Sequence, residues 1–212
     1  MTGFDVKCTA CPRLADFLAD IREQYPGYHG LPVAPFGDDN PDVLIIGLAP
    51  GMHGANATGR PFTGDYAGVL LYETLYKTGF SNQSTSDHVD DGLELINCRI
   101  TNAVKCLPPQ NKPTGAEINQ CNAFLKAELE SLESKRILIA LGSIAHNAIL
   151  KALGLKLSAY KFGHAAEHQL SDGFTLIDSY HCSRYNTQTR RLTAEMFEKV
   201  FDRARELQSM KR

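Results

Sequence analysis

Four apolar runs along the chain have the length and composition of buried β-strands. They are short, rich in branched side chains, and bounded by glycine, proline or polar residues. These runs span residues 43–46, 93–101, 136–141 and 174–179. Between and around them, apolar positions recur at helical spacing. This spacing predicts helices over residues 13–23, 67–79, 114–131, 142–153 and 193–208.

The alternation of strands and helices predicts an α/β fold. We expect one domain over residues 1–212, a three-layer α/β/α arrangement with a central four-stranded parallel sheet. Loops that follow parallel strands meet at the carboxyl edge of the sheet, where open α/β sheets bind ligands. The loop 47–65, Asn102 and the segment 181–186 each follow a predicted strand. We therefore expect them to lie close together.

Composition sets limits on the class of protein. The apolar fraction of 43% and the charged fraction of 22% are typical of a globular protein. The net charge of −2 excludes a global field that would attract nucleic acid. A nucleic-acid role needs local basic groups, such as Lys105 with Lys112 or Arg184 with Arg190 and Arg191. No run has the length of a membrane span, and the start lacks a secretory signal, so we expect a cytoplasmic monomer.

The loop 47–65 is rich in glycine but fits neither common phosphate-binding pattern. Neither G-x-G-x-x-G nor G-x-x-x-x-G-K-[ST] occurs in it. The loop carries an aromatic residue, Phe62, and a carboxylate, Asp65. Either Phe62 packs in the core and Asp65 caps the following helix, or both belong to a ligand site.

The side chains expected at this edge suit cleavage of a bond between a base and its sugar. Phe62 can stack on a flat ring, and the Asn102 amide presents a donor and an acceptor that match a nucleobase edge. His181 can donate to an oxygen that becomes anionic. Asp65 can orient water or stabilise a developing cation. Taken singly, each residue also has a structural explanation.

The cysteines suggest a metal centre. A cytosolic chain with six cysteines favours metal ligation, catalysis or burial over disulfides. Cys8 and Cys11 form a C-x-x-C pair ahead of a helix, whereas fourteen residues separate Cys106 from Cys121. The wide second spacing fits a zinc ribbon poorly and favours a [4Fe–4S] cluster. The alternative is that Cys106 and Cys121 are unrelated buried thiols.

Four motifs in order resemble the uracil-DNA glycosylase superfamily, in particular its fifth family, the B-type enzymes with an iron–sulfur cluster. The motifs are Gly47-Leu48-Ala49-Pro50-x-x-His53-Gly54, Gly59-Arg60-x-Phe62-Thr63-Gly64-Asp65, Ile100-Thr101-Asn102-Ala103-Val104-Lys105-Cys106 and His181-x-Ser183-x-x-Asn186-Thr187. This resemblance covers Cys8 to about Thr193. It implies a uracil-DNA glycosylase-like fold and a monofunctional DNA repair enzyme that flips uracil from double- or single-stranded DNA, hydrolyses the N-glycosidic bond and leaves an abasic site. Other deaminated bases are further candidate substrates.

The resemblance also implies a role for individual residues. The implied catalytic residues are Asp65 and His181. The implied substrate-binding residues are Ala49, Pro50, Gly51, His53, Phe62 and Asn102. The implied DNA contacts are Ser183, Arg184, Tyr185 and Asn186. The implied ligands of a [4Fe–4S] cluster are Cys8, Cys11, Cys106 and Cys121, which would tie the N-terminal segment to the loop and helix around 106–121.

Two positions depart from the family pattern. Cys182 stands where proline is usual after His181, and Arg190 stands where glycine is common before Arg-Leu-Thr. These departures bear on the substrate range more than on the reaction type. His164 and His168 either line the DNA face or have a structural role.

Two other classes of function remain open from the sequence. One is a protein of the same fold that binds damaged or single-stranded DNA without turnover. The other is an iron–sulfur electron carrier.

Overall fold

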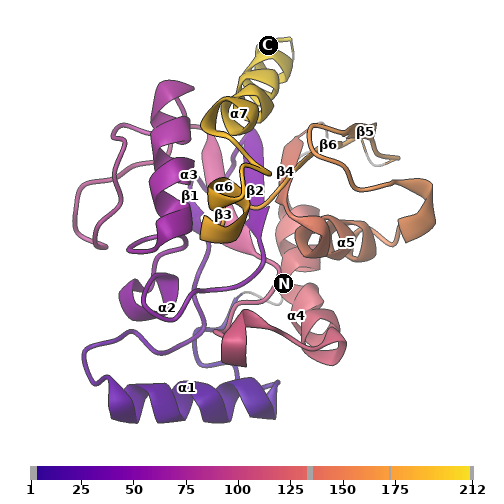
Figure 1. Ribbon diagram of the computed structural model, residues 1–212. Helices are drawn as coiled ribbons and strands as arrows, with labels where there is room; N and C mark the ends of the chain where they lie inside the picture. Colours follow the sequence, from indigo (N-terminus) through magenta and orange to yellow (C-terminus); the bar gives the residue numbers. More distant parts are fainter. Residues whose placement is uncertain (1–3, 133–135, 172, 211–212) are drawn as a thin grey trace.

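The predicted strands form the centre of one sheet. The structure is a computed structural model that describes residues 4–132, 136–171 and 173–210, so the two ends of the predicted domain lie outside the described residues. The central strands are β2 (Val43–Gly47), β3 (Cys98–Asn102), β4 (Ile137–Leu141) and β6 (Thr175–Ser179). They pair in parallel in the order β3-β2-β4-β6 (Figure 1). The predicted parallel core is therefore confirmed.

Two short strands extend the sheet at its edges. β1 (Phe36–Gly37) pairs antiparallel with β3, and β5 (Glu167–Gln169) pairs antiparallel with β6. The sequence did not predict them because two or three residues are too few to show an alternating pattern. β3 also begins later than predicted, since Asn97 has a left-handed backbone conformation, with φ of 52°, that interrupts the extended run.

Helices cover both faces of the sheet. The longer ones are α1 (Pro12–Gln24), α3 (Tyr66–Lys77), α4 (Gly115–Ser131), α5 (Ser143–Ala152) and α7 (Ala194–Ser209). Along β2, Val43 and Ile45 pack in the core beneath α3 and α7, whereas Leu44 and Ile46 pack beneath α4 and α5 (Figure 1). This explains why the strand reads as a continuous apolar run, because both of its faces are buried.

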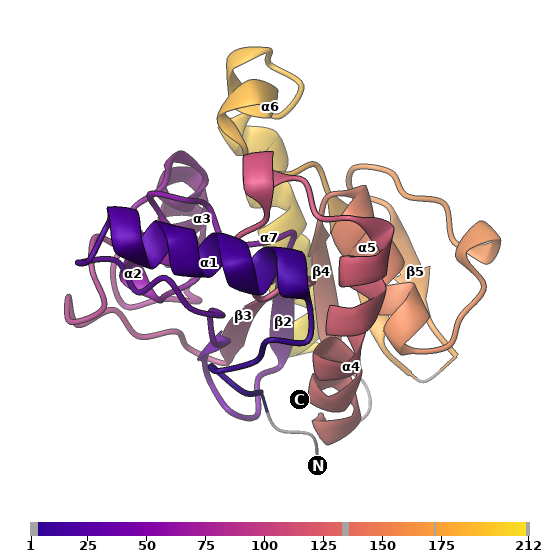
Figure 2. The same ribbon diagram turned by 90° about the horizontal axis from the view of Figure 1, so that it is seen from below.

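Helix α1 lies outside the three layers. Its apolar side is formed by Leu14, Leu18 and Ile21, which pack against Val104 and Leu107 in a separate small core. Figures 1 and 2 both show α1 beside the segment that leads from β3 to α4. None of the helices in the described part of the chain combines the length and hydropathy of a bilayer-spanning segment.

Several shorter elements surround the carboxyl edge of the sheet. They are α2 (Ala55–Thr58), α6 (Arg184–Gln188) and the 3₁₀ turns η1 (Pro109–Asn111) and η2 (Leu157–Ala159). Sequence reasoning treated the start of α6 as a loop, but the Ser183 side chain accepts a hydrogen bond from the Asn186 amide and caps it. Figure 2 shows α6 projecting from the body of the protein.

A buried ion pair joins α5 to β6. His146 Nδ1 lies 2.8 Å from Asp178 Oδ1, and His146 Nε2 lies 3.1 Å from the carbonyl oxygen of Tyr160. Both neighbours accept hydrogen bonds, so both ring nitrogens carry protons. Burial lowers the pKa of His146, but the hydrogen bond and charge of Asp178 outweigh it and raise that pKa overall. His168 Nε2 lies 3.4 Å from the other carboxylate oxygen. Although these three side chains are close enough to hold a metal ion, both nitrogens of His146 are already hydrogen bonded.

We predict that Asp178→Asn lowers the free energy of unfolding by about 3–5 kcal/mol below pH 6, because it leaves a buried imidazolium without its counter-charge. The folded-state pKa of His146 is raised above 6.5. The stability from the pair is therefore fully present below that pH and is lost as the pH rises through the folded-state pKa. Urea unfolding of the wild type and of Asp178→Asn measures this. The difference between their free energies of unfolding should narrow as the pH rises. A difference that is small at low pH, or that grows as the pH rises, would contradict the charged pair.

Candidate functional site

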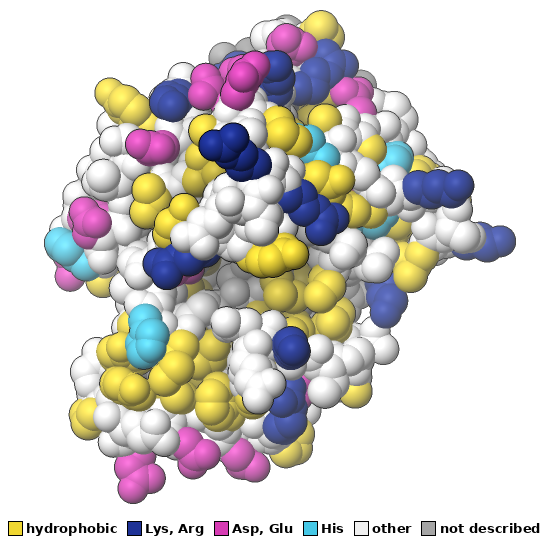
Figure 3. Space-filling view, in the orientation of Figure 1, with side chains coloured by type: hydrophobic (Ala, Val, Ile, Leu, Met, Phe, Trp, Pro, Cys, Tyr) yellow, Lys and Arg dark blue, Asp and Glu magenta, His cyan; other side chains and the backbone are white. Residues whose placement is uncertain are grey.

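A cavity of about 420 Å³ opens at the carboxyl edge of the sheet. It brings together Phe62, Asp65, Asn102 and His181, which are far apart along the chain. The other lining residues are Leu48, Ala49, Gly51, Ala55, Tyr66, Ala67, Asn111, Ser183 and Arg184. The space-filling view shows a hollow near the centre of this face, with apolar side chains in it (Figure 3). Its volume is in the range of small-molecule sites in proteins.

The back of the cavity depends on a glycine at the end of β2. A Cβ atom on Gly47 would lie 2.4 Å from Asn102 Oδ1 and 2.8 Å from Phe62 Cζ. Both are closer than carbon atoms tolerate, so a side chain here would push the aromatic ring or the amide out of place. The Phe62 ring is buried and stacks near the His181 ring, with centroids 5.9 Å apart and an interplanar angle of 29°.

Asn102 lines the cavity and carries an unsatisfied hydrogen-bond acceptor. Its residue is 3% exposed, and Oδ1 is buried with no hydrogen-bond partner among the described residues. Leaving a buried polar atom unpaired costs about 1–3 kcal/mol. A ligand that donates an N–H would satisfy it.

Asp65 lines the cavity, and one of its oxygens also caps a helix. Oδ1 accepts a hydrogen bond of 2.8 Å from the Gly68 amide and caps α3. Oδ2 faces the loop after β2, where a Cβ on Gly54 would lie 2.7 Å from it. Burial raises the pKa of Asp65, although backbone N–H groups of Gly68 and Ala67 oppose the rise. The helix cap and the ligand site are therefore compatible.

His181 follows the end of β6 and is fixed by its own backbone. The carbonyl oxygen of His181 accepts a hydrogen bond of 2.8 Å from Asn186 Nδ2. Burial lowers the pKa of His181 to about 4. The imidazole is therefore neutral at pH 7, and a neutral imidazole still has one N–H to donate.

Helix α6 forms one rim of the cavity. The Arg184 guanidinium stacks on the Tyr66 ring at 4.9 Å. Tyr185 is 70% exposed, which is unusual for a large aromatic residue. Cys182, which replaces the usual proline, is fully buried in the core beneath α7.

Some predicted site residues lie elsewhere. Pro50 is buried outside the cavity lining, and His53 is on the surface, where its Nδ1 lies 2.8 Å from the Tyr28 hydroxyl. Lys105, considered as a surface cation, is 2% exposed, and its Nζ lies against Thr101 and 3.5 Å from Glu128. That expectation was wrong, because Lys105 neutralises a carboxylate inside the protein.

Sequence reasoning missed Asn111 and the cavity-lining role of Tyr66. Asn111 lies in η1 with a left-handed φ of 55° and lines the cavity. The one available signal was its place in the Pro-rich segment that follows the strand ending at Asn102. Tyr66 lies just before the helix predicted from residue 67 and was given no role in the site, yet its ring supports Arg184.

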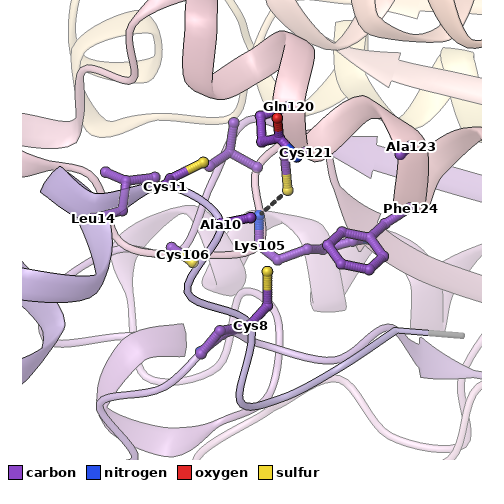
Figure 4. Close-up of a pocket in the computed structure, with 12 residues that line it drawn as sticks. Cys8, Ala10, Cys11, Leu14, Lys105, Cys106, Gln120, Cys121, Ala123 and Phe124 are labelled. Carbon is purple, nitrogen blue, oxygen red and sulfur yellow. Dashed lines mark hydrogen bonds between the residues drawn. The ribbon is translucent and has the colours of Figure 1, made fainter. Parts of the chain in front are cut away.

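The four cysteines Cys8, Cys11, Cys106 and Cys121 line a second, mainly apolar cavity of about 180 Å³. In Figure 4 the sulfur atoms of Cys8 and Cys121 point toward each other across it. The amide of Lys105 donates a hydrogen bond of 3.3 Å to Cys121 Sγ.

The thiols around this cavity are buried and are spaced more widely than the ligands of a single tetrahedral metal ion. Burial raises the pKa of Cys11, Cys106 and Cys121, that of Cys106 to about 12, and the neighbouring thiols raise each further. A bound cation would relieve this repulsion. Within the described residues, no three of these sulfur atoms lie within 4.8 Å of one another. Sulfur ligands of one tetrahedral zinc ion are closer, about 3.8 Å apart.

Comparison with known proteins agrees with this geometry. Residues 34–205 match the model of the family described as the uracil DNA glycosylase superfamily. A type-5 uracil-DNA glycosylase from Thermus thermophilus is 44% identical, over 94% of this chain and 93% of the relative. The type-5 enzymes from Pyrobaculum aerophilum and Mycobacterium leprae are 41% and 40% identical, over 94% of this chain and 88% and 91% of the relatives. The chain therefore belongs to the uracil DNA glycosylase superfamily and, within it, to the type-5 family.

Proposed function

We propose that this protein is a monofunctional uracil-DNA glycosylase that hydrolyses the N-glycosidic bond of uracil in DNA and leaves an abasic site. The observation that carries the proposal is the single cavity that holds Phe62, Asn102, Asp65 and His181. The names of the type-5 relatives support it. Other deaminated bases that fit the cavity are further candidate substrates.

Uracil matches the cavity in shape and in hydrogen bonding. Its flat ring stacks on Phe62, and its N3–H donates to the unpaired Asn102 Oδ1, while the Asn102 amide donates to O4. The backbone around Ala49 and Gly51 lines the same cavity and is placed to receive a base carbonyl. Because the base must leave the duplex to enter, weakly paired bases are favoured by the lower cost of flipping.

His181 and Asp65 have separate roles in cleavage of the N-glycosidic bond. As the bond between N1 and the sugar breaks, its electron pair moves onto the base, and the neutral imidazole of His181 donates a hydrogen bond to the oxygen that becomes negative. The ionised Asp65 stabilises the positive charge that develops on the sugar and directs a water molecule to it. The water adds at the sugar carbon, and the proton that it loses ends on the negatively charged base, so the products are the free base and an abasic site.

The four cysteines are proposed to hold a [4Fe–4S] cluster. The fit is supported by four thiols around one apolar cavity and by spacings too wide for a single zinc ion. The bound cluster supplies a rigid crosslink and no step of the hydrolysis. It would fix α1 to the segment between β3 and α4, and so would hold Asn111 at the cavity.

Helix α6 is proposed to contact the DNA. Arg184 supplies a cation at the rim, and the exposed Tyr185 is suited to wedge into the space that the flipped base leaves. Ser183 and Asn186 act indirectly, because their hydrogen bonds fix the turn that carries both side chains.

We predict that Asp65→Asn and His181→Ala each lower kcat for release of uracil from a duplex by about 10²–10⁴-fold. Asn keeps the helix cap, so the first variant should fold normally, which circular dichroism can check. Free base released per protein molecule is the measurement. Full activity in both variants would contradict the catalytic roles of Asp65 and His181. One turnover or fewer by the wild-type protein would favour a DNA-binding protein without turnover.

We predict that kcat falls toward low pH as Asp65 is protonated. Because burial raises the pKa of Asp65, the decline should begin at a higher pH than for an exposed carboxylate. A pH profile of single-turnover base release measures it. The residual activity of Asp65→Asn should lack this decline, and an unchanged decline in that variant would assign it to another group.

We predict that Cys106→Ser lowers the iron content from about four atoms per chain and lowers the thermal midpoint. Iron analysis of protein purified without oxygen measures the first effect, and visible absorbance monitors the cluster. Cys98→Ala is the matched control, since Cys98 is buried in the sheet outside this cavity. Equal iron content in wild type and Cys106→Ser would contradict the assignment.

A further inference from the structure

Arg190 occupies a backbone conformation that favours glycine. It follows the C-cap residue of α6, Thr189, and its φ is 56°. Its amide donates a hydrogen bond of 3.1 Å to the Thr187 carbonyl, which closes the end of the helix. At this position glycine is the usual residue, because a Cβ atom is strained in the left-handed region. A residue with a long cationic side chain therefore stands at a position where the backbone conformation disfavours any residue other than glycine.

The side chain of Arg190 has no polar partner among the described residues that would offset that strain. Arg190 is exposed, and among the described residues its guanidinium has no hydrogen bond and no ion pair. The side chain lines a hollow of about 560 Å³ between α3 and α6, together with Tyr66, Glu73 and Thr187. Strained backbone conformations cluster at functional sites, which directs attention to the side chain that Arg190 carries.

The hollow adjoins the base cavity. Tyr66 lines both, and the Thr187 hydroxyl donates a hydrogen bond of 3.3 Å to the Tyr66 hydroxyl. Tyr66, with Arg184 stacked on its ring, therefore borders both the space beside Arg190 and the cavity. Phosphates of one DNA strand follow each other at about 3.4 Å along the axis. A strand whose base enters the cavity would thus bring a neighbouring phosphate over this hollow.

The charges on this face agree with such a path. Figure 3 shows Lys and Arg side chains around the projection of α6, while most carboxylates lie toward the margins. Glu73 is an exception, because it lines the same hollow as Arg190. Glu73 would repel a phosphate there, whereas Arg190, which lines the same hollow, would attract it.

We propose that Arg190 binds a backbone phosphate next to the flipped nucleotide and so positions the damaged strand across α6. This inference rests on the proposed function and extends it to a residue outside the base cavity. Arg190 is a positioning residue, because it touches the DNA backbone and not the reacting atoms.

The test compares Arg190→Gly, Arg190→Lys and Lys126→Ala with the wild type. Binding to a duplex with an abasic-site analogue is measured by fluorescence anisotropy from 50 to 300 mM salt, and uracil release gives kcat and KM. Arg190→Gly should bind about 3–10-fold more weakly, raise KM rather than lower kcat, and reduce the slope of log affinity against log salt by about one. Arg190→Lys keeps the charge and should keep the wild-type slope. Lys126, on α4 and paired with Glu130, should have no effect on the slope.

Thermal unfolding gives a second readout. Arg190→Gly relieves the backbone strain, so its midpoint should rise by about 2–4 °C while its DNA binding weakens. A higher midpoint with unchanged affinity and salt slope would overturn the proposal and leave Arg190 as a strained surface residue. The affinity, the salt slope and the midpoint do not depend on catalysis, so absence of base release by the wild type would count against the proposed function alone.

Discussion

The site depends on how closely the backbone at the end of β2 approaches its neighbours. Gly47 lies against the Asn102 amide and the Phe62 ring, and Gly54 lies against the Asp65 carboxylate. Four side chains can surround one cavity only because these two backbone positions carry no side chain. The parallel sheet is the second requirement for the cavity, since it brings the ends of β2, β3 and β6 to one edge.

The same burial that forms the cavity sets its electrostatics. Removal from water raises the pKa of Asp65 and lowers that of His181, so neither charge is stabilised by solvent. In such a site, a hydrogen bond to a developing negative charge is stronger than it would be in water. Part of the free-energy cost of burying Asp65 and His181 is offset by hydrogen bonds within the fold, because Asp65 also caps α3 and Asn186 fixes the backbone of His181.

The sequence predicted the elements that bury continuous apolar runs and the residues that follow them. Asp65, Asn102 and His181 could be grouped from the sequence alone, because parallel strands end at one edge. Sequence alone could not place Asn111, whose position depends on the path from β3 to α4 around the cysteines. It also misplaced Lys105, because a lysine in a loop reads as exposed unless its partner Glu128, on a distant helix turn, is known to lie beside it.

The central claim is that the cavity at the carboxyl edge receives an extruded uracil. The most direct test is a crystal structure of the protein with a duplex that contains a non-hydrolysable 2′-fluoro-deoxyuridine. We expect the uracil outside the helix, stacked on Phe62, with N3 at hydrogen-bond distance from Asn102 Oδ1. A uracil that remains paired in the duplex, or that binds with N3 directed away from Asn102, would contradict the account.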